Sequence, residues 1–153
     1  MRKDSLKVRG FLRGQIVDAK TGKIVGDSGW VKNKATNAGL TNLANLIVGG
    51  GYAVGYAALG TQTDAVNMTQ TDLIGRENSF QGISTSTSGT CTATFTCSFA
   101  GADNSDTIAM GAAGLFKTNT AGSLVAMQTF ATSNMATNQN FNLTYQLRFA
   151  TAA

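Results

Sequence analysis

The side chains that could carry out chemistry in this sequence are eight carboxylates, two cysteines, the lysines and the tyrosines, because histidine is absent. Histidine is the commonest general base in enzymes and the commonest metal ligand in proteins. Two cysteines without histidine do not predict a zinc site. Asp72 and Glu77 are close in sequence, but nothing around them indicates a catalytic pair. The sequence therefore predicts a non-enzymatic protein with no catalytic residues, no metal and no cofactor.

Cys91 and Cys97 stand six positions apart in a segment that alternates as a β-strand does. At about 3.3 Å per residue, their Cα atoms would lie roughly 20 Å apart in one strand. A disulfide needs Cα atoms within about 7 Å, so the two thiols are not expected to pair with each other. Both fall on the same strand face as Phe95 and Phe99. We interpret Cys91 and Cys97 as thiols of the hydrophobic core, with a cross-link between subunits as the alternative.

Two short segments have compositions that also occur in ligand sites. The loop from Asp103 to Asp106 offers oxygen ligands that suit calcium, but it lacks the length and the final Glu of an EF-hand loop. A turn in which Asp and Asn side chains bond their own backbone is the other interpretation. The run from Gly49 to Gly51 lacks the Lys-Ser/Thr ending of a phosphate-binding loop. Because it follows a helical pattern, this run indicates a helix end.

Positive charge is concentrated near the N-terminus. Residues 1–34 hold nine of the twelve Lys and Arg, against three of the eight carboxylates. Lys7, Arg9 and Arg13 share one face of a predicted strand, and Phe11 lies on the same face. Such a face suits nucleic acid, an acidic protein surface or plain solvation. We take Lys7, Arg9, Phe11 and Arg13 as the candidate partner-docking residues.

Period-two alternation predicts most of the secondary structure. Apolar residues between Leu6 and Ile16 fall on one strand face, and residues 18–23 have a turn composition, so residues 6–32 predict a β-hairpin. A polar loop is expected at 61–72, and a linker or hairpin tip at 84–89. Further strands are expected at 56–59, 73–83, 90–99, 108–116, 124–132 and 141–149.

One helix is expected near residues 37–48, where apolar residues recur with helical spacing. Thr36 or Asn37 can cap its start. The spacing predicts that the buried face of this helix consists of Leu40, Leu43, Ala44 and Ile47.

These elements together predict an all-β fold, either a β-sandwich or a jelly-roll-like barrel of about seven to nine strands with one short helix near residues 37–48. We expect one domain, in which residues 1–34 form a basic N-terminal hairpin or arm and residues 35–153 form the sandwich core. The sequence has no secretory signal pattern and no apolar run of membrane-spanning length. We therefore expect a protein that folds in a cytoplasm and has no membrane partner.

Six segments, in order, resemble motifs of the small virion structural proteins of tailed phages. These segments are TNAGLTNLANLI at 36–47, YAALGTQTD at 56–64, TDLIGRE at 71–77, GTCTATFTCSF at 89–99, AAGLFKT at 112–118 and NFNLTYQLRF at 140–149. The sequence departs from this group in its longer basic start, residues 1–34, and in Ala112, where the group often has Glu. The group carries no catalytic residues that could be transferred to this chain.

The resemblance implies a β-sandwich that assembles in many copies as a head decoration (cement) or tail-associated protein. The expected partners are copies of the chain itself and major capsid or tail proteins, and the expected location is the virion, after synthesis in the host cytoplasm. The first alternative is a tail or tail-fibre component, including a receptor-binding module. The second is a nucleic-acid-binding β-barrel that uses its basic hairpin.

Overall fold

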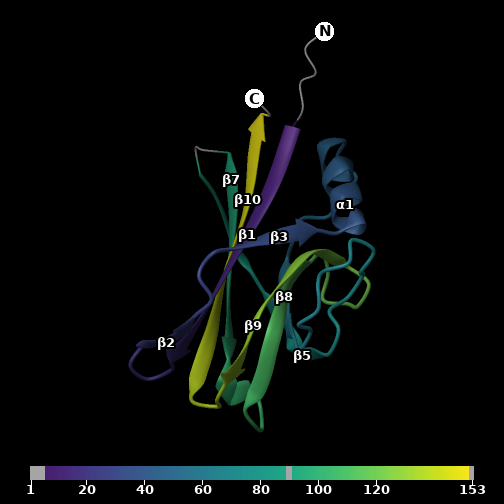
Figure 1. Ribbon diagram of the computed structural model, residues 1–153. Coiled ribbons are helices and arrows are strands. Elements are labelled where there is room, and N and C mark those ends of the chain that lie inside the picture. Colours follow the sequence, from purple (N-terminus) through teal and green to yellow (C-terminus); the bar gives the residue numbers. More distant parts are fainter. Residues whose placement is uncertain (1–5, 89–90, 152–153) are drawn as a thin grey trace.

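Antiparallel strands make up most of the chain, which is known from a computed structural model that describes residues 6–88 and 91–151 (Figure 1). Within these residues lie ten strands, one α-helix and one short 3-10 helix. In chain order they are β1 (Leu6–Asp18), β2 (Ile24–Asp27), β3 (Val31–Ala35), α1 (Asn37–Ile47), β4 (Tyr56–Gly60), β5 (Arg76–Gly82), β6 (Ser84–Ser88), β7 (Thr92–Ala100), η1 (Gly101–Asp103), β8 (Ile108–Phe116), β9 (Leu124–Met135) and β10 (Gln139–Thr151). The predicted all-β class with one short helix is confirmed.

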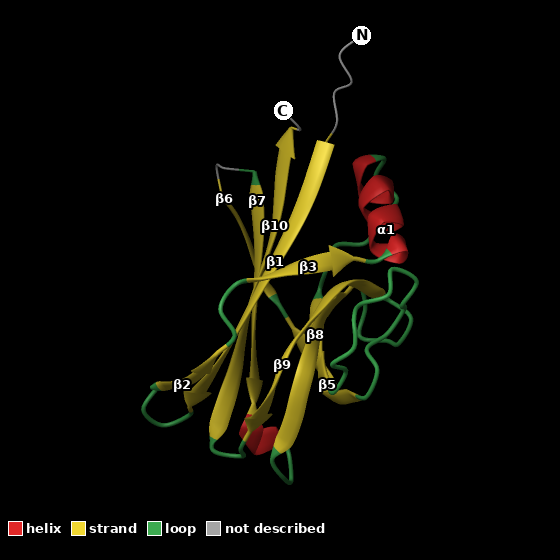
Figure 2. Cartoon of the chain, viewed as in Figure 1, coloured by secondary structure: helices red, strands yellow, loops and turns green. Residues whose placement is uncertain are grey.

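The strands form one curled sheet, a half-barrel, in the order β5-β4-β8-β9-β3-β1-β10-β7-β6, with β2 attached to β1 (Figure 2). The two halves of the sheet are joined by β3, which pairs with β1 through Val31–Asn33 and then with β9 through Lys34 and Ala35. Strands β5 and β6 stand at opposite ends of this order, although only Ile83 separates them along the chain. The N–H of Ile83 donates to the Gly55 carbonyl. The sheet therefore curls at β3, which pairs with one half of the sheet at its start and with the other half at its end.

The basic N-terminal segment lies in the middle of the sheet. Strand β1 pairs with β10 along its whole length, from Leu6 opposite Thr151 to Asp18 opposite Gln139. Its other edge holds β2 and β3, as the predicted hairpin requires. Residues 6–34 thus contribute a central strand, and the side chain of Leu12 from this strand is fully buried in the core.

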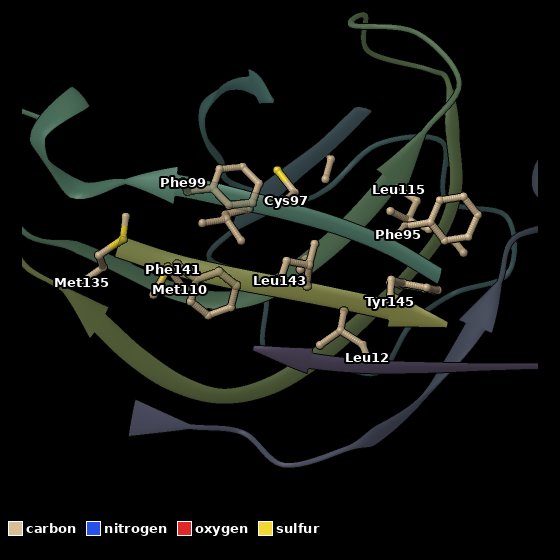
Figure 3. Packing of buried hydrophobic residues seen from close by; sticks show 14 of the residues in the cluster. Leu12, Phe95, Cys97, Phe99, Met110, Leu115, Met135, Phe141, Leu143 and Tyr145 are labelled. Atoms are coloured by element: carbon tan, nitrogen blue, oxygen red, sulfur yellow. The ribbon is translucent and has the colours of Figure 1, made fainter. Parts of the chain in front are cut away.

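The core lies on the inner face of the curled sheet, where neighbouring strands place apolar side chains in register (Figure 3). Leu12 stands opposite Tyr145, which in turn stands opposite Phe95. The rings of Phe95 and Tyr145 meet edge to face with 6.5 Å between their centres. Full burial of side chains of this size contributes about 1.5–3 kcal/mol each, so this row anchors β1 to β10 and β7.

A smaller apolar cluster lies on the other face of the β4-β8-β9 half and is covered by the loop 61–75. Val66 and Leu73 of this loop are buried against Phe116 and Met127. Residues 61–72, which were expected to be a polar loop, do form a loop. Its few apolar residues pack into this second apolar cluster.

Helix α1 begins and ends where the sequence predicts. The hydroxyl of Thr36 accepts a hydrogen bond from the Gly39 N–H, which is an N-cap. At the other end, Gly49 has a φ of +79° and donates to the Leu46 carbonyl, while Gly50 donates to the Asn45 carbonyl. These two bonds form a Schellman motif, so the glycine run is a helix end as expected.

The predicted buried face of α1 is wrong. Leu40 is 43% exposed and Ile47 79% exposed, whereas Gly39 and Asn42 are buried. The helix approaches β9 so closely that Gly39 lies against the Val125 backbone, where a β-carbon would collide. The spacing of the leucines could not reveal this, because the contact uses the residue that has no side chain.

The segment 84–89 was expected to be a linker or hairpin tip, but residues 84–88 form β6, which pairs with β7 from Ser84 opposite Thr96 to Ser88 opposite Thr92. A run of Ser and Thr has no apolar alternation, so its sequence alone does not predict a strand. The strand forms by pairing with β7. Residues 89 and 90 lie outside the described residues.

Candidate docking surface

Cations from three strands gather on the outer face of the sheet. Residues directly opposite in antiparallel strands point to the same side. Arg9 on β1 stands opposite Arg148 on β10, and Phe11 stands opposite Lys32 on β3. We call this surface the basic sheet face and define it as Lys7, Arg9, Phe11, Arg13, Lys32 and Arg148. The structure thus places the four predicted docking residues together and adds two that the sequence analysis missed.

Arg148 and Phe11 are in direct contact within this face. The guanidinium carbon lies 4.5 Å from the centre of the ring. Nε and Nη2 of the same guanidinium donate to Oε1 of Gln146, at 3.2 and 2.7 Å. The guanidinium therefore covers one face of the Phe11 ring.

Arg13 differs from the other cations because its charge is already paired. Its Nε donates to Oδ1 of Asp27 at 3.1 Å and its Nη2 to Oδ2 at 2.6 Å, a bidentate ion pair. Gln15 and the Gly29 backbone also donate to this carboxylate. The hydrogen bonds from Arg13 and Gln15 hold the pKa of Asp27 well below its usual range, and the pKa of Arg13 is raised by Asp27.

The other four cations of the basic sheet face, Lys7, Arg9, Lys32 and Arg148, have no carboxylate within ion-pair distance in the described part of the chain. Lys7, Arg9, Lys32 and Arg148 are all exposed. Beside them, β10 and β7 present uncharged polar side chains on the same side: Asn142, Thr144, Gln146, Thr94, Thr96 and Ser98. Since only Arg13 is neutralised, the face keeps a net positive charge that attracts acidic surfaces.

The two cysteines, predicted as core thiols, have different environments. Cys97 is buried beside Phe99, and burial raises the pKa of its thiol to about 11. Cys91 is exposed, so the prediction of a core position was wrong for this residue. Strand β7 begins only at Thr92, and Cys91 has a φ of +56°, so the alternation that sets the strand face does not extend to it. An exposed thiol is the more reactive kind.

The Asp103–Asp106 segment follows β7 and begins within η1. Nδ2 of Asn104 donates to the Gly101 carbonyl at 3.4 Å, as does its backbone N–H at 3.0 Å, so the segment includes the side-chain-to-backbone bonding of a turn. Among residues 6–88 and 91–151, no group of three or more His, Cys, Asp or Glu lies close enough to hold a metal ion. Over the same residues, no helix has the length and apolar character needed to cross a membrane.

Comparison of the chain with protein-family models, with curated proteins and with solved structures gives no match.

Proposed function

We propose that this protein is a non-enzymatic structural component of a tailed-phage particle, and within that class a capsid decoration or cement subunit. The observation that carries the proposal is the basic sheet face, where all the cations except Arg13 lack a carboxylate within ion-pair distance in the described part of the chain. The ordered motifs between Thr36 and Phe149 support the phage assignment.

Docking through this face has a physical basis in the distribution of charge. Only 13% of the residues are charged, and most of the cations belong to the first 34 residues. The basic sheet face therefore groups unpaired cations in a molecule whose surface otherwise carries few charges in the described residues. An acidic partner surface would orient the subunit as it approaches, while the uncharged surfaces can pack against neighbours without desolvating ions.

The test is attachment of charge-reversed protein to particles purified without it. The variant Lys7→Glu/Arg9→Glu changes two exposed side chains of the basic sheet face. Lys20→Glu/Lys23→Glu in the exposed β1–β2 turn makes the same change of net charge elsewhere. We expect the first variant to lose occupancy on particles and the second to keep it, with both folded by circular dichroism. Full occupancy of the first variant would refute docking through this face.

Copy number separates a head or tail-tube subunit from a baseplate or fibre component. Mass spectrometry of purified particles should find this chain in numbers comparable with the major capsid protein. A few copies for each particle would assign it to a baseplate or fibre instead, where receptor binding becomes the leading role.

Nucleic-acid binding is the remaining candidate, and one contact disfavours it. Single-stranded nucleic acid is usually held by bases stacked on exposed aromatic rings. The Phe11 ring is covered on one face by Arg148. Titration of single-stranded DNA over a range of salt concentrations decides the matter, because phosphate contacts give binding that falls steeply with salt.

A further inference from the structure

Helix α1 carries an apolar stripe that a single chain leaves uncovered (Figure 1). We define the α1 stripe as Leu40, Leu43, Ala44 and Ile47, whose spacing places them along one side of the helix. Leu40, Ala44 and Ile47 are exposed, because α1 packs on β9 through Gly39 instead. Apolar residues at this spacing normally mark the buried side of a helix, so the stripe is suited to a contact outside the chain.

The apolar surface continues on both sides of the stripe. Val48 and Tyr52, which follow the helix, are 81% and 65% exposed. On the other side lies an apolar groove of about 270 Å³, which Leu40 and Leu43 line together with Phe149 of β10. The stripe, the groove and the two residues after the helix therefore form one apolar surface, of the kind that marks protein interfaces.

The absence of charge in this part of the chain favours a second copy as the partner. Residues 35–63 include no Asp, Glu, Lys or Arg. An acidic or basic partner would therefore gain no ion pair from the helix. A two-fold contact brings the same patch of two copies together, so any charge in the patch would face its own counterpart. An uncharged apolar patch is free of that repulsion and can pack against itself.

The order of residues in the α1 stripe is self-complementary. Two copies of α1 can pack antiparallel about a two-fold axis that passes midway between residues 43 and 44. Leu40 of one copy then lies beside Ile47 of the other, and Leu43 lies beside Ala44, because the members of each pair are equally far from the midpoint. The small side chain of Ala44 allows the two helices to approach within the usual 8–10 Å or so between their axes.

The size of the surface indicates how strong this contact is. The eleven residues of α1 span only about 16 Å, whereas a stable interface buries about 800 Å² on each partner. Val48, Tyr52 and the mouth of the groove must therefore add to the helix contact. A contact of this size suits a dissociation constant on the order of 10 µM.

We propose that two copies of this chain associate through their α1 stripes, antiparallel and about a two-fold axis, with Val48 and Tyr52 of each copy lying against the mouth of the partner's groove. The groove is lined by residues of the inner face of the sheet, such as Val8 and Phe149, which stand opposite each other in the β1–β10 ladder. The basic sheet face is on the other side of these strands. The inference therefore goes beyond the proposed docking function and does not depend on it.

The first test is the mass of the full chain in solution, measured by sedimentation from about 5 to 200 µM, on either side of the expected dissociation constant. We expect the mass to rise from one chain to two. Ile47→Asp should raise the dissociation constant at least about tenfold, since it places two carboxylates in an apolar contact. The matched control is Ile24→Asp, the same change at a 52% exposed position on β2, which should leave the constant unchanged. Circular dichroism confirms that both variants are folded.

The second test checks the register by disulfide cross-linking with oxidised glutathione in a Cys91→Ser background. Ala44→Cys should cross-link to its own copy, because residue 44 lies beside the two-fold axis. Asn45→Cys, exposed but on another side of the helix, should not. A mixture of Leu40→Cys and Ile47→Cys should form the mixed dimer in excess over either homodimer, since a disulfide needs Cα atoms within about 7 Å.

A mass of one chain at the highest concentration would overturn the inference. In that case, shifts of the Leu40 and Leu43 amides in NMR titration with octanoate would assign the surface to an acyl chain, and their absence would assign it to a different protein. Equal effects of Ile47→Asp and Ile24→Asp on the dissociation constant would also overturn it. Cross-linking of Asn45→Cys in place of Ala44→Cys would show that a dimer forms through another side of the helix.

Discussion

The guanidinium of Arg148 lies 4.5 Å from the centre of the Phe11 ring, although the two residues come from the last and the first described strands. The contact exists because Arg9 stands opposite Arg148 in the β1–β10 ladder, which places Phe11 two residues farther along the same face. Two like charges directly opposite each other are unfavourable. Turning Arg148 over the ring, and holding it there with Gln146, moves its charge away from Arg9.

We predict a measurable coupling between Arg148 and Phe11. A double-mutant cycle of Phe11→Ala and Arg148→Ala in urea unfolding should give a coupling free energy of about 0.5–1 kcal/mol, since the pair is only partly buried. The cycle of Phe11→Ala with Lys20→Ala is the control, because Lys20 is distant and exposed. Additive effects in both cycles would mean that the cation and the ring do not interact in solution.

Asn33→Leu is expected to stabilise the fold. Leucine has a similar size and removes two buried polar atoms that have no partner within the described residues. The free energy of unfolding should rise by about 1 kcal/mol, measured by urea unfolding. A loss of stability of similar size would show instead that the amide is satisfied in solution, for example by bound water.

The two thiols should react at very different rates. At pH 8 in native conditions, one equivalent of a thiol reagent should label Cys91 quickly, because that residue is exposed. Cys97 should react only on unfolding, since it is buried and its pKa of about 11 keeps the thiol protonated. Peptide mapping after partial labelling identifies the site. Fast labelling of Cys97 would contradict its place in the core, and Cys91→Ser is the control that removes the fast phase.

The Asp27 ion pair should make stability depend on pH in acid. The folded pKa of Asp27 lies below its ordinary value, so the contribution is complete above the unfolded value near 3.8 and is lost as pH falls through the folded pKa. Asp27→Asn should therefore lower the urea midpoint at pH 7 and lower it progressively less below about pH 4. A difference that stays constant from pH 7 to pH 2 would mean that ionisation of Asp27 is not the cause.

Local patterns in the sequence were enough to predict most of the strands, but β6 and the contacts between elements depend on long-range pairing. Alternation in β1 and β7 predicts the inner and outer faces, because a strand sets them by geometry alone. The same rule fails at Cys91, which has a positive φ and lies just before the strand, because β7 begins only at Thr92 and not at residue 90 as the pattern suggests. The N-cap Thr36 and the glycine run that starts at Gly49 predict where α1 begins and ends. They do not predict which face of the helix is buried, because that depends on its contact with β9.

The basic sheet face was half predictable for the same reason. Lys7, Arg9 and Arg13 share a strand, so their common face is visible in the sequence. Arg148 and Lys32 join them only through the registers of β10 and β3 with β1. The ion pair between Arg13 and Asp27 forms because β2 folds back onto β1, and no local sequence pattern predicts it.

The pairing of β1 with β10 also determines how the chain can fold. Strand β1 can pair early with β2 and β3, but its opposite edge must wait until β10 has been synthesised. Contacts of such long sequence separation make folding slow and leave that edge unpaired in the meantime. An unpaired edge is a template for association with other chains, and charged side chains along a strand oppose it. Lys7, Arg9 and Arg13 lie along β1, so their charges oppose such association while that edge is unpaired.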